Sequence, residues 1–303
     1  MKIKPSPYFL LIIATVIWGG NFVVGRAFHG DIGPLSLNFW RWLLSGLILA
    51  PYAVSGFKNN LDLIRRHALL LGVLALSGMV MFHSLIYWAL HTTSAINAGM
   101  VLASMPLVIP MIAFVAGEDS LSLRQGIGIA ISFVGVGVIV TRGNADVLLG
   151  LKFAIGDLLV LGAVVMWSVY SVLLKRLPKD LPPMVSLATI NWIAVAMLLP
   201  AYLWEFSNIG GFVVSVQNMM AIAYVAIFAS IVAFVSWNSA VQVVGPNRSG
   251  LFIHVIPISS AILAIIFLGE KLEVYHIAGV VPIIIGILLT TRGVNKKTQT
   301  AKR

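Results

Sequence analysis

The sequence predicts an all-α integral membrane protein with ten transmembrane helices, arranged as two inverted five-helix repeats. Composition is the first reason: 59% of the 303 residues are hydrophobic, 10% are charged, and the mean hydropathy is +1.00. So few polar residues cannot cover a soluble domain of this size. The second reason is that apolar residues form runs of about 20, the length that crosses a hydrocarbon core roughly 30 Å thick. The third is an internal repeat.

Short connectors containing Gly, Asn and charged residues separate the apolar runs, and none is long enough to form another domain. The first run follows Met1 to Lys4 and could also be a cleaved signal peptide. It takes part in the repeat, however, so we assign it to the folded unit. The predicted spans cover residues 7–27, 35–54, 67–90, 93–116, 124–142, 154–175, 183–205, 217–241, 248–268 and 274–292.

The two halves of the chain carry the same residues in the same order. Trp18 is followed by Trp167 at a spacing of 149 residues, and Pro106 by Pro257 at a spacing of 151. Each copy holds five spans, an odd number, so the second copy must enter the membrane from the opposite side. This gives an inverted-topology repeat, which recurs in secondary transporters. The predicted units are residues 7–143 and 154–293.

Basic residues predict the orientation, because cytoplasmic loops of membrane proteins carry an excess of Lys and Arg. With the N-terminus inside, 15 of the 20 Lys and Arg residues fall on the inner side. We therefore expect a multi-pass protein of the cytoplasmic (inner) membrane with both termini in the cytoplasm. The five basic residues on the outer side are Arg26, Arg41, Arg142, Lys152 and Lys271.

Several function classes lack the residues that they need. The chain has no cysteine, which excludes thiolate metal ligands, disulfides and thiol nucleophiles. Its basic residues lie between apolar runs and form no folded basic face, so no nucleic-acid partner is expected. No H-E-x-x-H motif, nucleophile elbow or phosphate-binding Gly-Lys loop is present. We expect no enzyme activity, no catalytic or metal-binding residue and no cofactor.

A set of short motifs recurs in a fixed order along the chain. They are Trp18-Gly19-Gly20-Asn21-Phe22, Ser94-Ala95 to Gly99 before Pro106, Gly117-Glu118, Gly156-Asp157 with Trp167 and Tyr170, and Pro257, Phe267 to Leu272 and Gly286. In order and duplication they resemble the drug/metabolite transporter superfamily, specifically its ten-span EamA-type members. The resemblance covers nearly the whole chain.

The resemblance implies a secondary carrier that moves small metabolites, often amino acids outward, through a central cavity between the repeats. It leaves the cargo open. Lipid or lipid-linked sugar translocases occur in the same superfamily, and a lateral polar groove open to lipid would favour that alternative. An intramembrane enzyme is a further alternative, and it would need a titratable cluster at one depth that the sequence does not offer.

Two prolines in equivalent positions are predicted to kink their helices. A proline inside a helix leaves the carbonyl four residues earlier without its donor, so Pro106 would free the carbonyl of Leu102 and Pro257 that of Ile253. Freed carbonyls and a kink would shape a site near the membrane midplane. The alternative is that these prolines only bend their helices.

Aromatic and titratable residues near mid-span are the candidates for the cavity. Trp18 and Trp167 would leave an indole N–H without a partner if they faced lipid, so we expect both to face inward. His83 and His254 titrate near neutral pH and are candidates for proton coupling, the alternative being neutral histidines that face the bundle. The complete predicted lining is Trp18, Asn21, His83, Tyr87, Ser104, Trp167, Tyr170 and His254.

Other polar and aromatic residues are given structural roles. We expect Asp157 to cap its own helix, Arg41 to snorkel to the outer interface, and Trp88 and Trp237 to lie in the interfacial aromatic belt. Glu270 is expected to make hinge hydrogen bonds or to pair with a nearby base. Small residues are assigned to helix packing, namely Ala95, Gly99, Ala103, Gly126, Gly128, Gly135 and Gly137.

Overall fold

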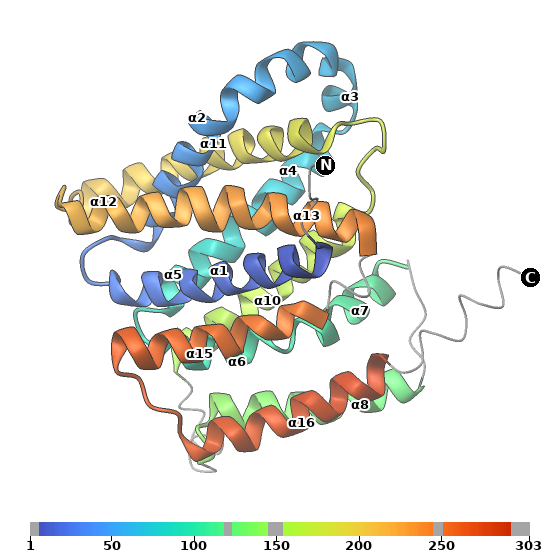
Figure 1. Cartoon of the computed structure of the whole chain (residues 1–303), viewed down its shortest axis with the longest axis vertical. Helices are drawn as coiled ribbons and strands as arrows, with labels where there is room; N and C mark the ends of the chain where they lie inside the picture. Colours follow the sequence, from blue (N-terminus) through green and yellow to red (C-terminus); the bar gives the residue numbers. More distant parts are fainter. Residues whose placement is uncertain (1–5, 118–122, 145–153, 245–250, 292–303) are drawn as a thin grey trace, which may run out of the picture.

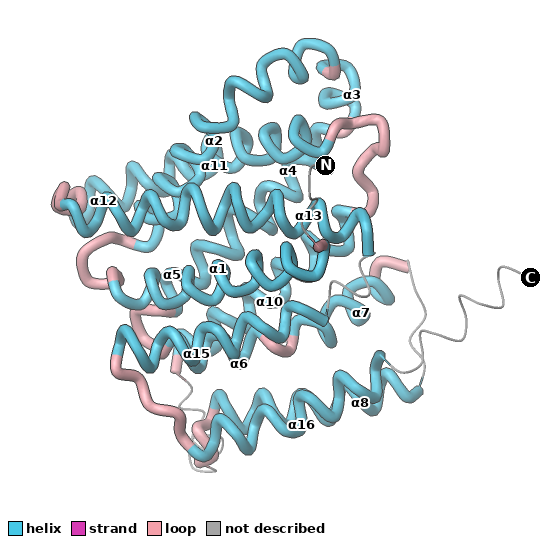
Figure 2. The backbone as a smooth tube through the Cα atoms, in the orientation of Figure 1, coloured by secondary structure: helices cyan, strands magenta, loops and turns pink. Residues whose placement is uncertain are grey.

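A computed structural model describes residues 6–117, 123–144, 154–244 and 251–291. All regular structure in these ranges is helical, and they contain no strand (Figure 2). Glu118, the first three residues of the ninth predicted span and the end of the tenth lie outside the described residues. The predicted all-α class is confirmed for the part of the chain that is described.

The helices follow the predicted spans to within a few residues (Figure 1). In the first half they are α1 (Pro7–Ala27), α2 (Pro34–Asn59), α3 (Leu61–Arg66), α4 (Ala68–Leu74), η1 (Ala75–Met81), α5 (Phe82–Ala89), α6 (Ala95–Leu102), α7 (Met105–Val115) and α8 (Leu123–Val140). In the second half they are α10 (Ile155–Leu174), α11 (Pro183–Ile209), α12 (Val216–Ala223), η2 (Tyr224–Val232), α13 (Ala233–Val244), η3 (Leu251–His254), α15 (Val255–Leu268) and α16 (Val274–Thr291).

Five helices in the described ranges are long and apolar enough to cross a membrane: α1, the continuous α4–η1–α5 rod, α10, α11 and the α12–η2–α13 rod. Helices α6 and α7 count as a sixth if this pair, bent by 43°, is one span. The apolar parts of α8, α15 and α16 are shorter. Length and composition thus support a membrane protein, and the ten crossings stay a prediction.

The helix contacts follow the repeat: each helix packs on the equivalents of the helices that its own equivalent packs on. Helix α2 packs on α11 and α8 on α16, which are pairs of equivalent helices. Helix α1 packs on α13 and α15, and its equivalent α10 packs on α5, α6 and α7. In Figure 1 the α2–α11 pair lies at the top, the α8–α16 pair at the bottom, and α1 and α10 cross the middle.

Glycines let two helix pairs, α8–α16 and α6–α15, approach closely. A Cβ on Gly135 would collide with the carbonyl oxygen of Gly279, and one on Gly279 would collide with that of Gly135, so α8 and α16 touch through their backbones. A Cβ on Gly99 would lie 3.3 Å from the Cα of Pro257, where α6 meets α15. Inside a membrane the hydrophobic effect does not drive helices together. Small residues at such crossings instead stabilise the helix pair by allowing close packing. Gly126 and Gly137, by contrast, face open space.

Each copy contains a π-helical segment in the equivalent place. η1 begins at Ala75 and η2 at Tyr224, a spacing of 149 residues. A π-turn disturbs the regular i→i−4 ladder, and such turns are frequent at functional sites. Carbonyls of both segments accept hydrogen bonds from side chains of neighbouring helices: Asn38 donates to Met79, and Ser45 to Ala226.

Candidate functional site

Both repeated prolines lie in the first turn of an α-helix. Helix α6 ends at Leu102, α7 begins at Met105, and the two are bent by 43°. Pro106 is the second residue of α7, and Pro257 is the third residue of α15, which follows the 3₁₀ turn η3. Proline suits the first turn because the N–H that it lacks would have no partner there. Both prolines therefore lie at helix starts, and the start that holds Pro106 coincides with the 43° bend between α6 and α7.

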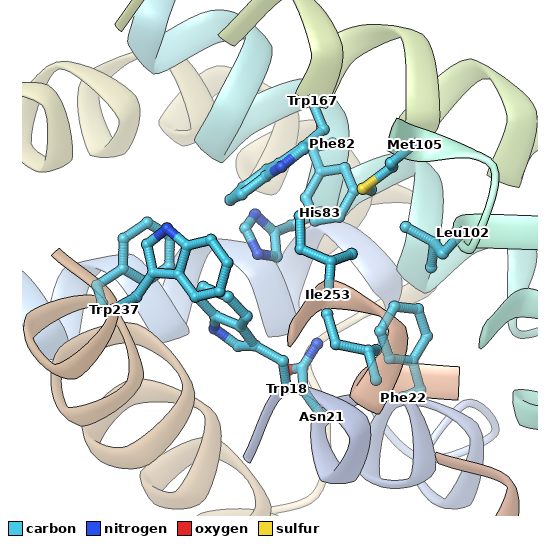
Figure 3. Close-up of a pocket in the computed structure, with 12 residues that line it drawn as sticks. Trp18, Asn21, Phe22, Phe82, His83, Leu102, Met105, Trp167, Trp237 and Ile253 are labelled. Atoms are coloured by element: carbon cyan, nitrogen blue, oxygen red, sulfur yellow. The ribbon is translucent and has the colours of Figure 1, made fainter. Parts of the chain in front are cut away.

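A cavity of about 40 Å³ lies where α6, α7, η3 and α15 meet α1, α5, α10 and α13. Both copies contribute to it, and Figure 3 shows the side chains that surround it. Ten of the lining side chains are aliphatic or aromatic, and Asn21 and His83 are the other two. The lining is Trp18, Asn21, Phe22, Phe82, His83, Leu102, Met105, Trp167, Phe234, Trp237, Ile253 and Ile256.

Aromatic rings from three helices, α1, α10 and α13, make up one end of the cavity. The ring centre of Trp18 lies 5.3 Å from that of Trp237, 5.6 Å from that of Phe234 and 6.2 Å from that of Trp167. The indole N–H of Trp18 donates to the carbonyl of Ala229 in η2 at 3.1 Å. Trp18 thereby joins the first copy to the second, with its N–H satisfied as a buried indole requires.

His83 lies in the middle of the lining in Figure 3. It is buried, its ring centre is 4.8 Å from that of Phe82 and 5.4 Å from that of Trp42, and its Nδ1 has no hydrogen-bond partner. A buried polar nitrogen without a partner is uncommon and calls for an explanation. His83 thus brings a polar side chain to the cavity wall.

The structure places the eight predicted cavity residues at different distances from the cavity. Trp18, Asn21, His83 and Trp167 line it. Tyr170 packs against Trp167 at 5.1 Å, and the hydroxyl of Tyr87 donates to Asn21 at 2.7 Å. Ser104 donates to Val101 at the α6–α7 break, and His254 closes η3 beside the lining residue Ile253 without lining the cavity itself.

The prediction that Arg41 snorkels to the outer interface is wrong. Arg41 is fully buried. Its Nη1 donates to the Tyr87 hydroxyl at 2.9 Å and to Asn21 Oδ1 at 3.3 Å, and its Nη2 donates to the carbonyl of Ala229 at 3.2 Å. A polar stripe at positions 38, 41 and 45 of the otherwise apolar α2 was the available signal, because residues spaced by three and four share a helix face.

Trp237 was also predicted wrongly. It lines the cavity next to Trp18 and does not lie in an interfacial belt. Its repeat equivalent Trp88 is 47% exposed, as the belt prediction expects. The two copies therefore differ at this position, and their equivalence in sequence concealed the difference.

Asp157 lies in the first turn of α10, as predicted for a residue that complements the helix dipole, but it makes no cap hydrogen bond there, contrary to the rest of the prediction. Helix α10 has no side-chain cap. The fully buried Asp157 accepts hydrogen bonds from the Thr93 hydroxyl and from Asn97 Nδ2, the latter at 2.9 Å. It ties α10 to the start of α6, which holds one wall of the cavity in place.

Glu270 makes hydrogen bonds rather than an ion pair. Its two carboxylate oxygens accept from the backbone N–H groups of Ala95 and Ile96 at 2.9 and 3.0 Å. Gly269 ends α15 in the left-handed conformation, with φ of 66°, which turns the chain toward α6. A carboxylate at this place satisfies N–H groups of the first turn and complements the helix dipole.

A polar cavity of about 230 Å³ lies beside this contact. Side chains of both charges surround it, so it has no single sign of potential. It is separated from the aromatic cavity along α6, since Asn97 lines the polar cavity and Leu102 the aromatic one. Its lining is Ser94, Asn97, Arg142, Glu270, Lys271, Glu273, Tyr275 and His276.

Comparisons with known proteins agree with this architecture. The family model of the EamA-like transporter family matches residues 5–141 and again residues 154–292. "Uncharacterized transporter YyaM" of Bacillus subtilis is 26% identical over 97% of this chain and 98% of its own length. A "Probable terminal-alkyne amino-acid exporter" of Streptantibioticus cattleyicolor is 24% identical over 96% of this chain and 95% of its own length. A solved crystal structure is similar with a TM-score of 0.59 and 20% identity, covering 94% of this chain and 96% of that one, which shows a shared fold.

The matched family and the names of the relatives indicate a membrane transporter, and not an enzyme. The chain belongs to the EamA-like transporter family, whose domain it contains twice. The resemblance inferred from its motifs is thereby confirmed. Its substrate is a small molecule, and its surroundings are a membrane.

Proposed function

We propose that the chain is a secondary active or facilitative transporter of the cytoplasmic membrane that exports a small metabolite, such as an amino acid, by alternating access. The observation that carries this proposal is the aromatic cavity, because residues of both copies line it and the broken α6–α7 pair borders it. Broken helices at a repeat interface are the usual setting of a substrate site in secondary transporters.

The proposed topology is ten spans in two inverted repeats, with both termini in the cytoplasm. The matched contacts of equivalent helices support the repeat. The 15 to 5 distribution of basic residues supports the orientation. In Figure 1, α1 begins and α16 ends at the same side of the bundle, as ten crossings require.

The size of the cavity favours a carrier over an open pore. A water needs about 10–15 Å³ of such volume, so 40 Å³ holds a few waters and no amino acid. Cargo would enter after the repeats move apart around the α6–α7 break and the η3–α15 junction. His83 and His254 remain candidates for proton coupling in this cycle.

An amino acid is favoured because one relative bears the name of an amino-acid exporter. A lipid or lipid-linked sugar translocase would need a polar groove open to lipid, and the central cavity has a mainly aliphatic and aromatic lining.

The test is a comparison of metabolites inside and outside cells that overexpress or lack the protein. We expect one or a few small metabolites to accumulate outside the overexpressing cells and inside the deleted ones. Proteoliposomes with the purified protein should then take up the same compounds. If neither assay reveals a transported metabolite while labelled lipid is moved between leaflets, the lipid alternative replaces the proposal.

A further inference from the structure

Arg41 is a buried cation whose hydrogen-bond partners are all neutral. It is fully buried, and it donates to Ser230 Oγ, Tyr87 Oη, Asn21 Oδ1 and the carbonyl of Ala229. A guanidinium keeps its proton at every physiological pH. A full positive charge therefore lies inside an apolar bundle, where a charge is costly unless an opposite charge balances it.

The buried acids of the described chain are engaged elsewhere. Asp157 accepts from the side chains of Thr93 and Asn97. Glu205 accepts from the N–H groups of Leu35 and Ser36 at the start of α2, at 3.0 and 2.7 Å. Neither carboxylate bonds Arg41, so its hydrogen bonds supply no balancing negative charge.

Asn21 separates this cation from the aromatic cavity. Its Oδ1 accepts from both the Tyr87 hydroxyl at 2.7 Å and Arg41 Nη1 at 3.3 Å, and Asn21 lines the cavity. Two donors thus converge on one oxygen at the cavity wall. The Arg41 bond is long, and a carboxylate would make shorter and stronger charge-assisted bonds with the same donors.

We propose that Arg41 and Tyr87 receive a carboxylate of the cargo when the side chain of Asn21 turns aside. The cargo would then join one carboxylate to an apolar or aromatic body that packs among Trp18, Trp167 and Trp237. One positive charge matches one carboxylate better than a doubly charged phosphate. The inference rests on the proposed transport function and names the substrate class of that same cavity.

The test compares binding of three probes to the purified full-length protein, followed by intrinsic tryptophan fluorescence. L-Phenylalanine and 3-phenylpropanoate carry the carboxylate, and L-phenylalaninamide lacks it. We expect the wild type to bind both acids at least about tenfold more tightly than the amide, the lower end of what a hydrogen bond to a charged group contributes. Arg41→Gln should bring this acid-to-amide ratio close to one, and Arg41→Lys should keep part of it.

Arg65→Gln is the matched control. Arg65 is an exposed residue of α3, so its replacement removes the same charge far from the cavity and should leave the ratio unchanged. Thermal unfolding checks that each variant folds. If Arg41→Gln does not fold, Tyr87→Phe removes one donor while the charge stays, and it should lower the ratio by a smaller factor.

Equal binding of acid and amide by the wild type, or no binding of either acid, overturns the inference. The same holds if Arg41→Gln weakens acid and amide by one common factor, which would make Arg41 a structural residue. Uptake of the probes into proteoliposomes separates the two proposals. Uptake without preference for the acids leaves transport standing and overturns only the carboxylate site, whereas Arg41-dependent binding without uptake supports the site and contradicts transport.

Discussion

Trp18 makes two kinds of contact with the second copy through one side chain. Its ring contacts aromatic residues of the second copy, and its N–H donates to a carbonyl of the π-segment η2. The sequence predicted that Trp18 and Trp167 face inward because an indole N–H in lipid would lack a partner. The same physical argument does not apply to Phe82 or Phe234, which have no polar atom, and their position in the lining could not be predicted in this way.

The two candidate histidines are expected to differ in function. His83 lines the cavity, whereas His254 does not line it. We therefore expect His83→Gln to change the cargo KM by roughly tenfold, the loss of one or two hydrogen bonds, and His254→Gln to leave it near the wild-type value. Uptake into proteoliposomes between pH 5 and 8 gives both numbers.

The pH profile of these variants decides on proton coupling. If only His83→Gln abolishes the pH dependence of uptake, His83 is the coupling group, because glutamine cannot titrate in this range. If both variants match the wild type in KM and in pH profile, both histidines are packing residues.

At the scale of elements, the starts of α7 and α15 depend on the backbone N–H that Pro106 and Pro257 lack. Alanine at position 106 or 257 restores an N–H that can bond the carbonyl four residues earlier and continue the helix through the break. We expect Pro106→Ala and Pro257→Ala to lower the transport rate severalfold while membrane insertion stays near wild type. Pro51→Ala is the control, since Pro51 lies inside α2 and is exposed. Equal losses of transport and insertion would instead indicate a folding role.

The α8–α16 contact provides a prediction about stability. Gly135→Ala places a methyl group against the backbone of α16, and overpacking of this kind costs about 1–3 kcal/mol. Gly137→Ala, on the same helix, faces open space and should be neutral or slightly stabilising. Thermal unfolding of the purified variants measures the difference. Similar unfolding temperatures for the two variants would contradict the close backbone contact.

At the scale of the whole molecule, the topology leads to a prediction for reporter fusions. Ten spans with the N-terminus inside place residue 60 and residue 303 in the cytoplasm and residue 146 outside. Reporters that are active only in the cytoplasm should work at the first two positions and fail at the third. A reporter that reads cytoplasmic at residue 146 would rule out the inverted arrangement of two five-span copies.

The two copies differ at several positions in and beside the cavity. At a spacing of 149 residues, Arg41 corresponds to Ile190 and His83 to Val232, and the exposed Trp88 corresponds to the cavity residue Trp237. A shared scaffold needs equivalent residues, whereas recognition of an asymmetric solute needs different ones. This explains why the repeat located the helices well and the functional residues less well.

The sequence by itself determined the all-helical class, the positions of the helices, the family, and four residues of the cavity lining. These follow from local properties, namely the length of apolar runs, the order of motifs and the need of each indole N–H for a partner. Only the tertiary structure decided that Arg41 and Trp237 face inward, that Asp157 holds α6, and that both π-segments offer carbonyls to neighbouring helices. The physical reason is that these helices are apolar on nearly every side, because lipid is as apolar as the protein interior, so hydrophobic periodicity does not distinguish the face toward the cavity from the face toward lipid.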